Sequence, residues 1–214
     1  MRFYAILYVV AYLLFVGTLF ILPLFSFEGA SILETTIGAL GAQKVPGNWF
    51  ANATVIILSF AVVPLATKQL GSYWKQLAVL YTFCIVFFFT GMYQLAGLDA
   101  QQYIFNYTND ALHSLFSVIT GFAFCLFCVF FIVILKEKAH RWQTFIVFSL
   151  ALILPLLMWY LPAYKGILQR VLFLVTFGWL FYALTSYPLK RSNSKASQIR
   201  RYNELKKHIQ KNEK

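Results

Sequence analysis

The residues of this chain that could bind a ligand form a small polar set between long apolar runs. Asp110 and His113 stand three positions apart, so a helix through them would place both side chains on one face. Gln169 and Arg170 place an amide and a cation at the start of a later apolar run. A cation and a histidine oriented by a carboxylate suit an anionic head group. Three further positions complete the candidate ligand-binding set: Glu34, Asn52 and Asp99.

Metal-dependent lipid hydrolysis is the enzymatic alternative for these residues. It needs several His and Asp side chains to hold an ion that activates water. Of the 3 histidines, His140 lies on the other side of the membrane in the topology derived below, and His208 is near the C-terminus. Only His113 remains for such a site. The sequence therefore predicts no metal site, no cofactor and no recognisable catalytic motif.

A purely structural interpretation of the same polar positions stays open. Asn109 or Asp110 could cap the helix that begins there, because the first N–H groups of a helix lack intrahelical partners. His113 could bond a loop carbonyl, and Arg170 could extend to lipid head groups. Cys125 and Cys128 form a C-x-x-C, but the motif lies inside an unbroken apolar run with no cation nearby, which favours packing over thiol redox chemistry.

The elements that must position these residues follow from the composition. The 214 residues are 60% hydrophobic, 19% aromatic and only 12% charged, with a mean hydropathy of +0.69. Soluble domains have about half apolar and a quarter charged residues. The chain is therefore predicted to be an all-α integral membrane protein, since continuous apolar runs favour helices over the alternating strands of a barrel.

Six apolar runs are long enough to cross the bilayer, which takes about 20 helical residues. They predict a bundle of six transmembrane helices within a membrane domain of residues 1–189, followed by a basic tail of residues 190–214. The predicted spans are Tyr4–Leu24, Phe50–Thr67, Trp74–Leu95, Ala111–Leu135, Thr144–Leu161 and Ile167–Tyr187.

The Lys and Arg residues predict the orientation, because they are enriched in cytoplasmic loops. With both termini in the cytoplasm, 15 of the 18 lie inside and 3 outside. Nine of them fall in residues 190–214, so the net charge of +11 is mainly a topology signal, and nucleic acid is not a predicted partner. The acidic residues Glu28, Glu34, Asp99 and Asp110 fall on or near the outer face.

The C-terminal tail carries a weakly apolar stripe, Ile199, Tyr202, Leu205 and Ile209, among its basic residues. Such a helical segment could lie on anionic lipid of the inner leaflet. A solvated tail and a tail that binds a protein partner are the alternatives.

At several of these positions the chain resembles a six-helix membrane family called domain of unknown function 998. The residues that carry the resemblance are Ile37–Ala42, Asn52, Asp99, His113, Gln169, Arg170 and Trp179. The resemblance covers residues 4–187 and implies a mainly prokaryotic protein, without a settled activity and distantly similar to the Frag1 type. The family's first loop often carries Ser and Glu where this chain has Gly38 and Ala39.

Together these observations predict a multi-pass protein of the bacterial plasma membrane. We expect it to handle or sense a lipid or small amphiphile through a polar pocket on the extracytoplasmic side, with membrane lipids as its partners. A secondary transporter is the alternative, although no internal repeat or pair of broken helices is evident. A non-catalytic membrane scaffold is a second alternative.

Overall fold

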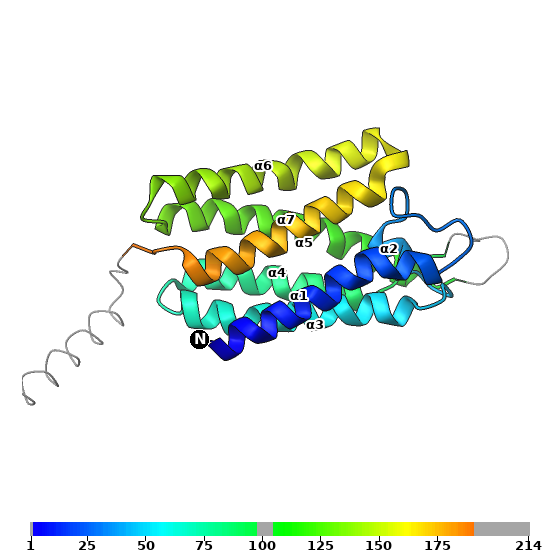
Figure 1. The fold of residues 1–214 in the computed structure, drawn as a ribbon, viewed down its shortest axis with the longest axis horizontal. Helices are drawn as coiled ribbons and strands as arrows, with labels where there is room; N and C mark the ends of the chain where they lie inside the picture. Colours follow the sequence, from blue (N-terminus) through cyan, green and yellow to red (C-terminus); the bar gives the residue numbers. More distant parts are fainter. Residues whose placement is uncertain (1, 98–104, 191–214) are drawn as a thin grey trace, which may run out of the picture.

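The computed structural model describes residues 2–97 and 105–190, and its regular structure is almost entirely helical (Figure 1). The long helices are α1 (Arg2–Ile21), α3 (Asn48–Leu70), α4 (Trp74–Met92), α5 (Tyr107–Ile134), α6 (Lys138–Tyr160) and α7 (Lys165–Ser186). The short ones are η1 (Leu22–Phe25), α2 (Ile37–Leu40) and η2 (Pro162–Tyr164). The extended pairing in the described part is an isolated bridge between Leu135 and Leu189.

All six long helices are long and apolar enough to cross a membrane, as hydropathy predicts, which is consistent with a multi-pass membrane protein. Their central regions coincide with the predicted spans, but α3 and α6 are longer than predicted. In α6 the helix begins at Lys138, six residues before the predicted start at Thr144. Hydropathy detects only the apolar part of a helix, whereas backbone hydrogen bonding continues through the polar residues that flank it.

The six long helices form a ring. In the order α1, α3, α4, α5, α6 and α7, each packs against the next, and α7 packs against α1 to close the circle. Tyrosines join the first helix to the last: Tyr8 and Tyr12 of α1 donate hydrogen bonds of 2.8 and 2.9 Å to the carbonyls of Phe177 and Leu174 in α7. The ring therefore has an interior that side chains from several helices share.

Aromatic side chains fill much of that interior. Phe15 of α1 makes edge contacts with Phe87 of α4 and with Phe173 and Phe177 of α7. Phe83 stacks on Phe87 with the two rings almost parallel, at an interplanar angle of 4°. These rings join α1, α4 and α7 inside the ring of helices.

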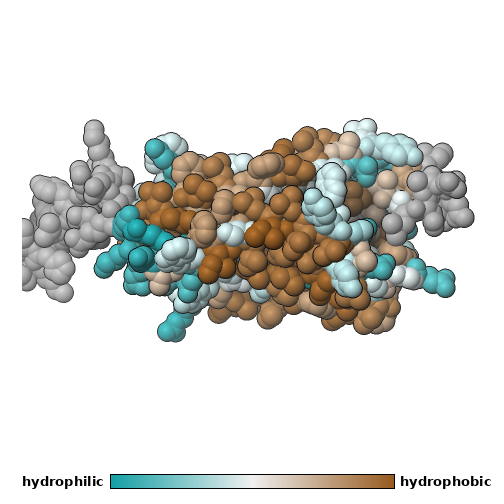
Figure 2. Space-filling model, turned by 90° about the horizontal axis from the view of Figure 1, so that it is seen from above, coloured by the Kyte–Doolittle hydropathy of each residue, from teal (hydrophilic) through white to brown (hydrophobic). Residues whose placement is uncertain are grey.

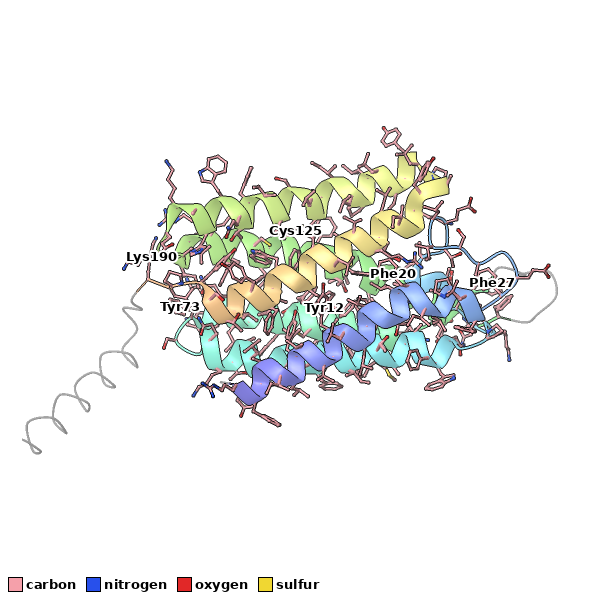
Figure 3. The ribbon with its side chains drawn as sticks, in the orientation of Figure 1. Tyr12, Phe20, Phe27, Tyr73, Cys125 and Lys190 are labelled. Carbon is pink, nitrogen blue, oxygen red and sulfur yellow. The ribbon has the colours of Figure 1, made fainter. Side chains whose placement is uncertain are left out.

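The two ends of the bundle differ. One end, called the α2 end below, carries residues 22–47 and the turn between α6 and α7 (Figure 1). The other end carries the N-terminus, where Tyr73 donates a hydrogen bond to the carbonyl of Lys190 (Figure 3). In Figure 2 a hydrophobic surface covers the middle of the molecule, with hydrophilic residues gathered toward both ends. This pattern matches what a membrane-spanning bundle requires.

Candidate ligand-binding cavity

A cavity of about 230 Å³, called the main cavity below, lies inside the ring between α4, α5, α6 and α7. Aromatic rings dominate its walls, and hydroxyl and amide groups interrupt them. It is lined by Phe83, Phe87, Thr90, Ser117, Thr120, Gly121, Phe124, Ala151, Pro155, Met158, Gln169, Leu172, Phe173, Thr176 and Phe177. None of these residues carries a formal charge.

A smaller space of about 50 Å³, called the polar recess below, adjoins the main cavity at the α2 end. The two spaces share Phe87, Thr90, Ser117, Gln169 and Phe173. The recess adds the candidate residues Asn52 and His113, together with Ile37, Gly38 and Val55. Its volume is enough for a water molecule or a small polar group.

The cavity is open on one side. Its exposed lining residues, Ser117 and Gly121 of α5 and Pro155 of α6, place the opening between these two helices. Pro155 lacks an N–H and so cannot bond the carbonyl of Ala151, one turn earlier on the cavity wall. A Cβ added at Gly121 would meet nothing within 4 Å. The exposed residues at the opening are therefore a serine, a glycine and a proline rather than bulky side chains.

Helical spacing explains how the walls are built. On α5, His113, Ser117, Thr120 and Phe124 recur every three or four residues and thus share one face. On α7, Gln169, Phe173 and Thr176 repeat the same spacing. On α5 the stripe is polar toward the α2 end and reaches an aromatic ring at Phe124. On α7 the ring of Phe173 lies between the amide of Gln169 and the hydroxyl of Thr176, so the main cavity combines aromatic walls with separate hydroxyl groups.

His113 has one ring nitrogen fixed and the other facing the recess. Its Nδ1 lies 2.9 Å from the carbonyl oxygen of Thr90 and 2.8 Å from that of Tyr93. Both partners are acceptors, so Nδ1 must carry the proton. Thr90 is in the last turn of α4, where carbonyls lack intrahelical donors. His113 thus caps α4, while its Nε2 lies close enough to Gly38 that an added Cβ there would be only 3.2 Å away.

Gln169 joins α7 to α2. Its Oε1 accepts a 2.7 Å hydrogen bond from the N–H of Ile37, the first residue of α2. Because the N–H of Ile37 needs an acceptor, the oxygen of the Gln169 amide must point toward it. The NH₂ of the same amide therefore points away from Ile37. Gln169 lines both the main cavity and the recess. Within the described residues, no protein group accepts a bond from this NH₂.

Asn52 holds the other end of α2. Its Nδ2 donates a 2.9 Å hydrogen bond to the carbonyl of Gly41, and Asn48 donates one of 3.0 Å to the carbonyl of Ala42. Both asparagines lie in the first turns of α3. Asn52 therefore shapes the recess by fixing the short helix that forms its wall.

Asp110 lies one turn before His113 but lines neither space. Its Oδ1 accepts a 2.8 Å hydrogen bond from the N–H of Ala96, so it fastens the loop after α4 to α5. The side chain that caps α5 belongs to Asn106, whose Oδ1 accepts from the N–H of Asn109. The sequence predicts this cap at Asn109 or Asp110, whereas Asn106 forms it in the structure.

Arg170 is only 1% exposed and lines neither space. Its Nε donates to the carbonyl of Leu19 at 2.7 Å, and its Nη1 donates to those of Ile32 and Thr35, both at 2.8 Å. Leu19 is in the last turn of α1, where the helix dipole favours a cation. Its buried Nη2 has no partner among the described residues. Arg170 therefore binds α1 and the first loop, away from His113.

The acidic candidate Glu34 does not line the main cavity or the polar recess. Glu34 is exposed and lines a separate hollow of about 380 Å³ that Lys165 and Pro162 also border. Asp99 falls outside the described residues. The structure thus brings Asn52, His113 and Gln169 together, and places Glu34, Asp110 and Arg170 outside that group.

Within the described residues, neither a metal-binding cluster nor a cysteine contributes to the lining of the main cavity. No group of three or more His, Cys, Asp or Glu side chains in residues 2–97 and 105–190 is placed to hold a metal ion. Cys84, Cys125 and Cys128 are free and buried. The polar chemistry that the main cavity and its recess provide is hydrogen bonding.

Several lining residues were not among the sequence candidates. Ser117, Thr120 and Thr176 lie within apolar runs, where hydropathy averages conceal single hydroxyl groups. Their signal was their spacing, since Ser117 and Thr120 continue the helical face of His113. Gln43 was also missed: its amide bonds Asn106 and Gln94 and so joins three loops at the α2 end.

No protein-family model, curated protein or solved structure matches this chain. The resemblance to the six-helix family therefore stays a prediction.

Proposed function

We propose that the protein binds and handles a lipid or small amphiphile within a bacterial plasma membrane. The observation that carries the proposal is the combination of an aromatic cavity with a polar recess at one end. An amphiphile has the same two parts, and burying its chain against Phe83, Phe124 and Phe177 would contribute about 25 cal/mol per Å² of apolar surface.

The orientation that we propose places both termini in the cytoplasm and the α2 end outside. Exposed cations at the other end of the described chain support it, among them Lys68, Lys75, Lys136 and Lys138. The polar recess then lies in the extracytoplasmic half of the membrane, near the depth of lipid head groups. The tail of residues 191–214 falls outside the described part of the chain, and its contact with anionic inner-leaflet lipid remains part of the proposal.

The side opening supports access from the bilayer. In a membrane, the gap between α5 and α6 at Gly121 and Pro155 would face lipid chains rather than water. A hydrocarbon chain could enter there without leaving an apolar environment. Toward the opposite end, buried rings of Phe127, Phe131 and Trp179 fill the interior, which favours a binding site over a continuous path.

Native mass spectrometry of the purified protein in mild detergent tests this proposal. We expect the wild-type protein to retain a lipid adduct and a Gly121→Leu variant to lose most of it, because the added side chain would occupy the opening. Gly17→Leu is the matched control, since an added Cβ at Gly17 on α1 also meets nothing within 4 Å. This control should keep the adduct.

Equal retention by both variants, with equal thermal stability, would overturn the proposal. An adduct-free wild-type protein that exchanges a soluble solute in proteoliposomes would do so as well, and would favour a secondary transporter.

A further inference from the structure

The lining of the cavity limits the charge of its occupant. The polar groups of the main cavity and the recess come from Asn52, Thr90, His113, Ser117, Thr120, Gln169 and Thr176, and no Lys, Arg, Asp or Glu is among the lining residues. An ionised head group would lose its hydration there without gaining a counter-charge, which costs several kcal/mol. The lining therefore suits an uncharged head group.

The hydrogen-bond roles of two residues narrow the choice further. His113 uses its Nδ1–H on the carbonyls of Thr90 and Tyr93, so in the neutral ring Nε2 is an acceptor. Gln169 uses its Oε1 on the N–H of Ile37, so its free NH₂ is a donor. Both side chains line the same 50 Å³ recess and can meet one small group.

The occupant must therefore donate to His113 and accept from Gln169. A hydroxyl does both through a single oxygen. An ester or ether oxygen only accepts, an ammonium group only donates, and a carboxylate adds an uncompensated charge.

We propose that the cavity selects a single-chain lipid alcohol, with its hydroxyl in the polar recess between His113 and Gln169. This rests on the proposed function and specifies the ligand of the same site. The main cavity, at about 230 Å³, is smaller than the roughly 300–1,000 Å³ of a typical drug-sized pocket. That space accommodates one hydrocarbon chain along Phe83, Phe87 and Phe173, with the rest of the chain passing out between α5 and α6.

Photo-crosslinking with a matched set of probes tests this inference. The probes share one alkyl chain with a diazirine and differ only in the head group, which is a hydroxyl, a methyl ether, a carboxylate or a trimethylammonium. Labelling of the wild-type protein is measured against probe concentration. We expect the alcohol to bind on the order of tenfold more tightly than the ether, because the ether leaves His113 Nε2 without a donor. The charged probes should label least.

The variant His113→Asn isolates the role of Nε2. Its side-chain amide can still donate to the carbonyls of Thr90 and Tyr93 and preserve the cap of α4, but it has no acceptor at the position of Nε2. We expect the preference for alcohol over ether to fall to about one in this variant. The comparison in the wild-type protein needs no substitution, so it stands even where the variant is unstable.

The outcomes separate the two proposals. Alcohol and ether labelling with equal affinity in the wild-type protein, or preferred labelling by the carboxylate, would overturn the alcohol inference. If Gly121→Leu still suppresses that labelling and Gly17→Leu does not, the proposed lipid function stands. Labelling that is insensitive to Gly121→Leu would overturn both.

Discussion

Gln169 and Arg170 are adjacent in the chain and serve different parts of the molecule, because successive residues of an α-helix point about 100° apart. Gln169 faces the cavity and the first N–H of α2, whereas Arg170 faces the end of α1 and the carbonyls of the first loop. Their shared polarity therefore supports two functions. One is recognition in the recess, and the other is stabilisation of the loop that encloses it.

The first prediction concerns this buried guanidinium. Arg170→Met would leave the carbonyls of Leu19, Ile32 and Thr35 without their donor, and we expect it to lower the free energy of unfolding by about 3 kcal/mol or more. Arg141→Met is the matched control. Arg141 is half-buried and donates to a single carbonyl, that of Leu135, so its loss should cost about 1 kcal/mol.

Thermal or denaturant unfolding in detergent measures both variants. An equal loss of unfolding free energy in the two variants would show that the three buried carbonyl contacts of Arg170 stabilise the fold no more than the single one of Arg141. A stable Arg170→Met protein that loses its lipid adduct would contradict the assignment of Arg170 to the loop rather than to the ligand.

The sequence could not predict which candidate side chains come together in the fold, and the reason is physical. The spacing of Asp110 and His113 correctly places them on neighbouring turns of one helix. This spacing does not show which loop the carboxylate of Asp110 will bind, because its partner, the N–H of Ala96, is 14 residues away in the sequence. Arg170 was grouped with His113 by charge, whereas its nearest acceptors are backbone carbonyls, which a sequence pattern does not display.

At the scale of elements, α2 is the part of the fold that depends most on tertiary contacts. A helix of four residues has no stability of its own. Thr36 caps it by accepting from the N–H of Ala39, Gln169 binds its first N–H, and Asn52 binds the carbonyl that follows it. These contacts place Gly38 directly against the polar recess.

The second prediction tests that placement. Gly38→Ala would put a Cβ 3.2 Å from His113 Nε2 and 3.0 Å from Leu95 Cδ1. The leucine end can move aside, so we expect a stability change within about 1 kcal/mol. The added methyl would occupy space needed by the head group, so the alcohol probe should label about fivefold more weakly. Gly17→Ala, with open space around its Cβ, should leave labelling unchanged.

Undiminished labelling of Gly38→Ala would place the head group elsewhere in the cavity. A large loss of stability would instead show that the wall between α2 and α5 cannot adjust.

The long helices, unlike α2, were largely predictable. Their existence follows from continuous apolar runs, and the structure confirms all six as long and apolar enough to span a membrane. Their ends were less predictable, as the polar first turns of α6 show. The stripe of His113, Ser117 and Thr120 was present in the sequence, but its meaning depended on knowing that α5 turns this face toward α4, α6 and α7.

At the scale of the whole molecule, the two ends of the bundle are the main asymmetry. The polar recess and the acidic residues Glu28, Glu34 and Asp110 lie at the α2 end, and most of the described cations lie at the other. Because Lys and Arg side chains favour the cytoplasmic side of a membrane, such a bundle would insert with the recess outside. The ligand would then be an amphiphile of the outer leaflet.

The third prediction addresses this orientation through cysteine accessibility. Cys84, Cys125 and Cys128 are buried, and replacing them with alanine gives a background for single reporter cysteines. Glu28 at the α2 end and Lys138 at the other end are both exposed. A membrane-impermeant maleimide should label Glu28→Cys in intact cells and Lys138→Cys only after permeabilisation. The reverse pattern would move the recess to the cytoplasmic leaflet, while labelling of both sites in intact cells would contradict a bundle whose ends face opposite sides of the membrane.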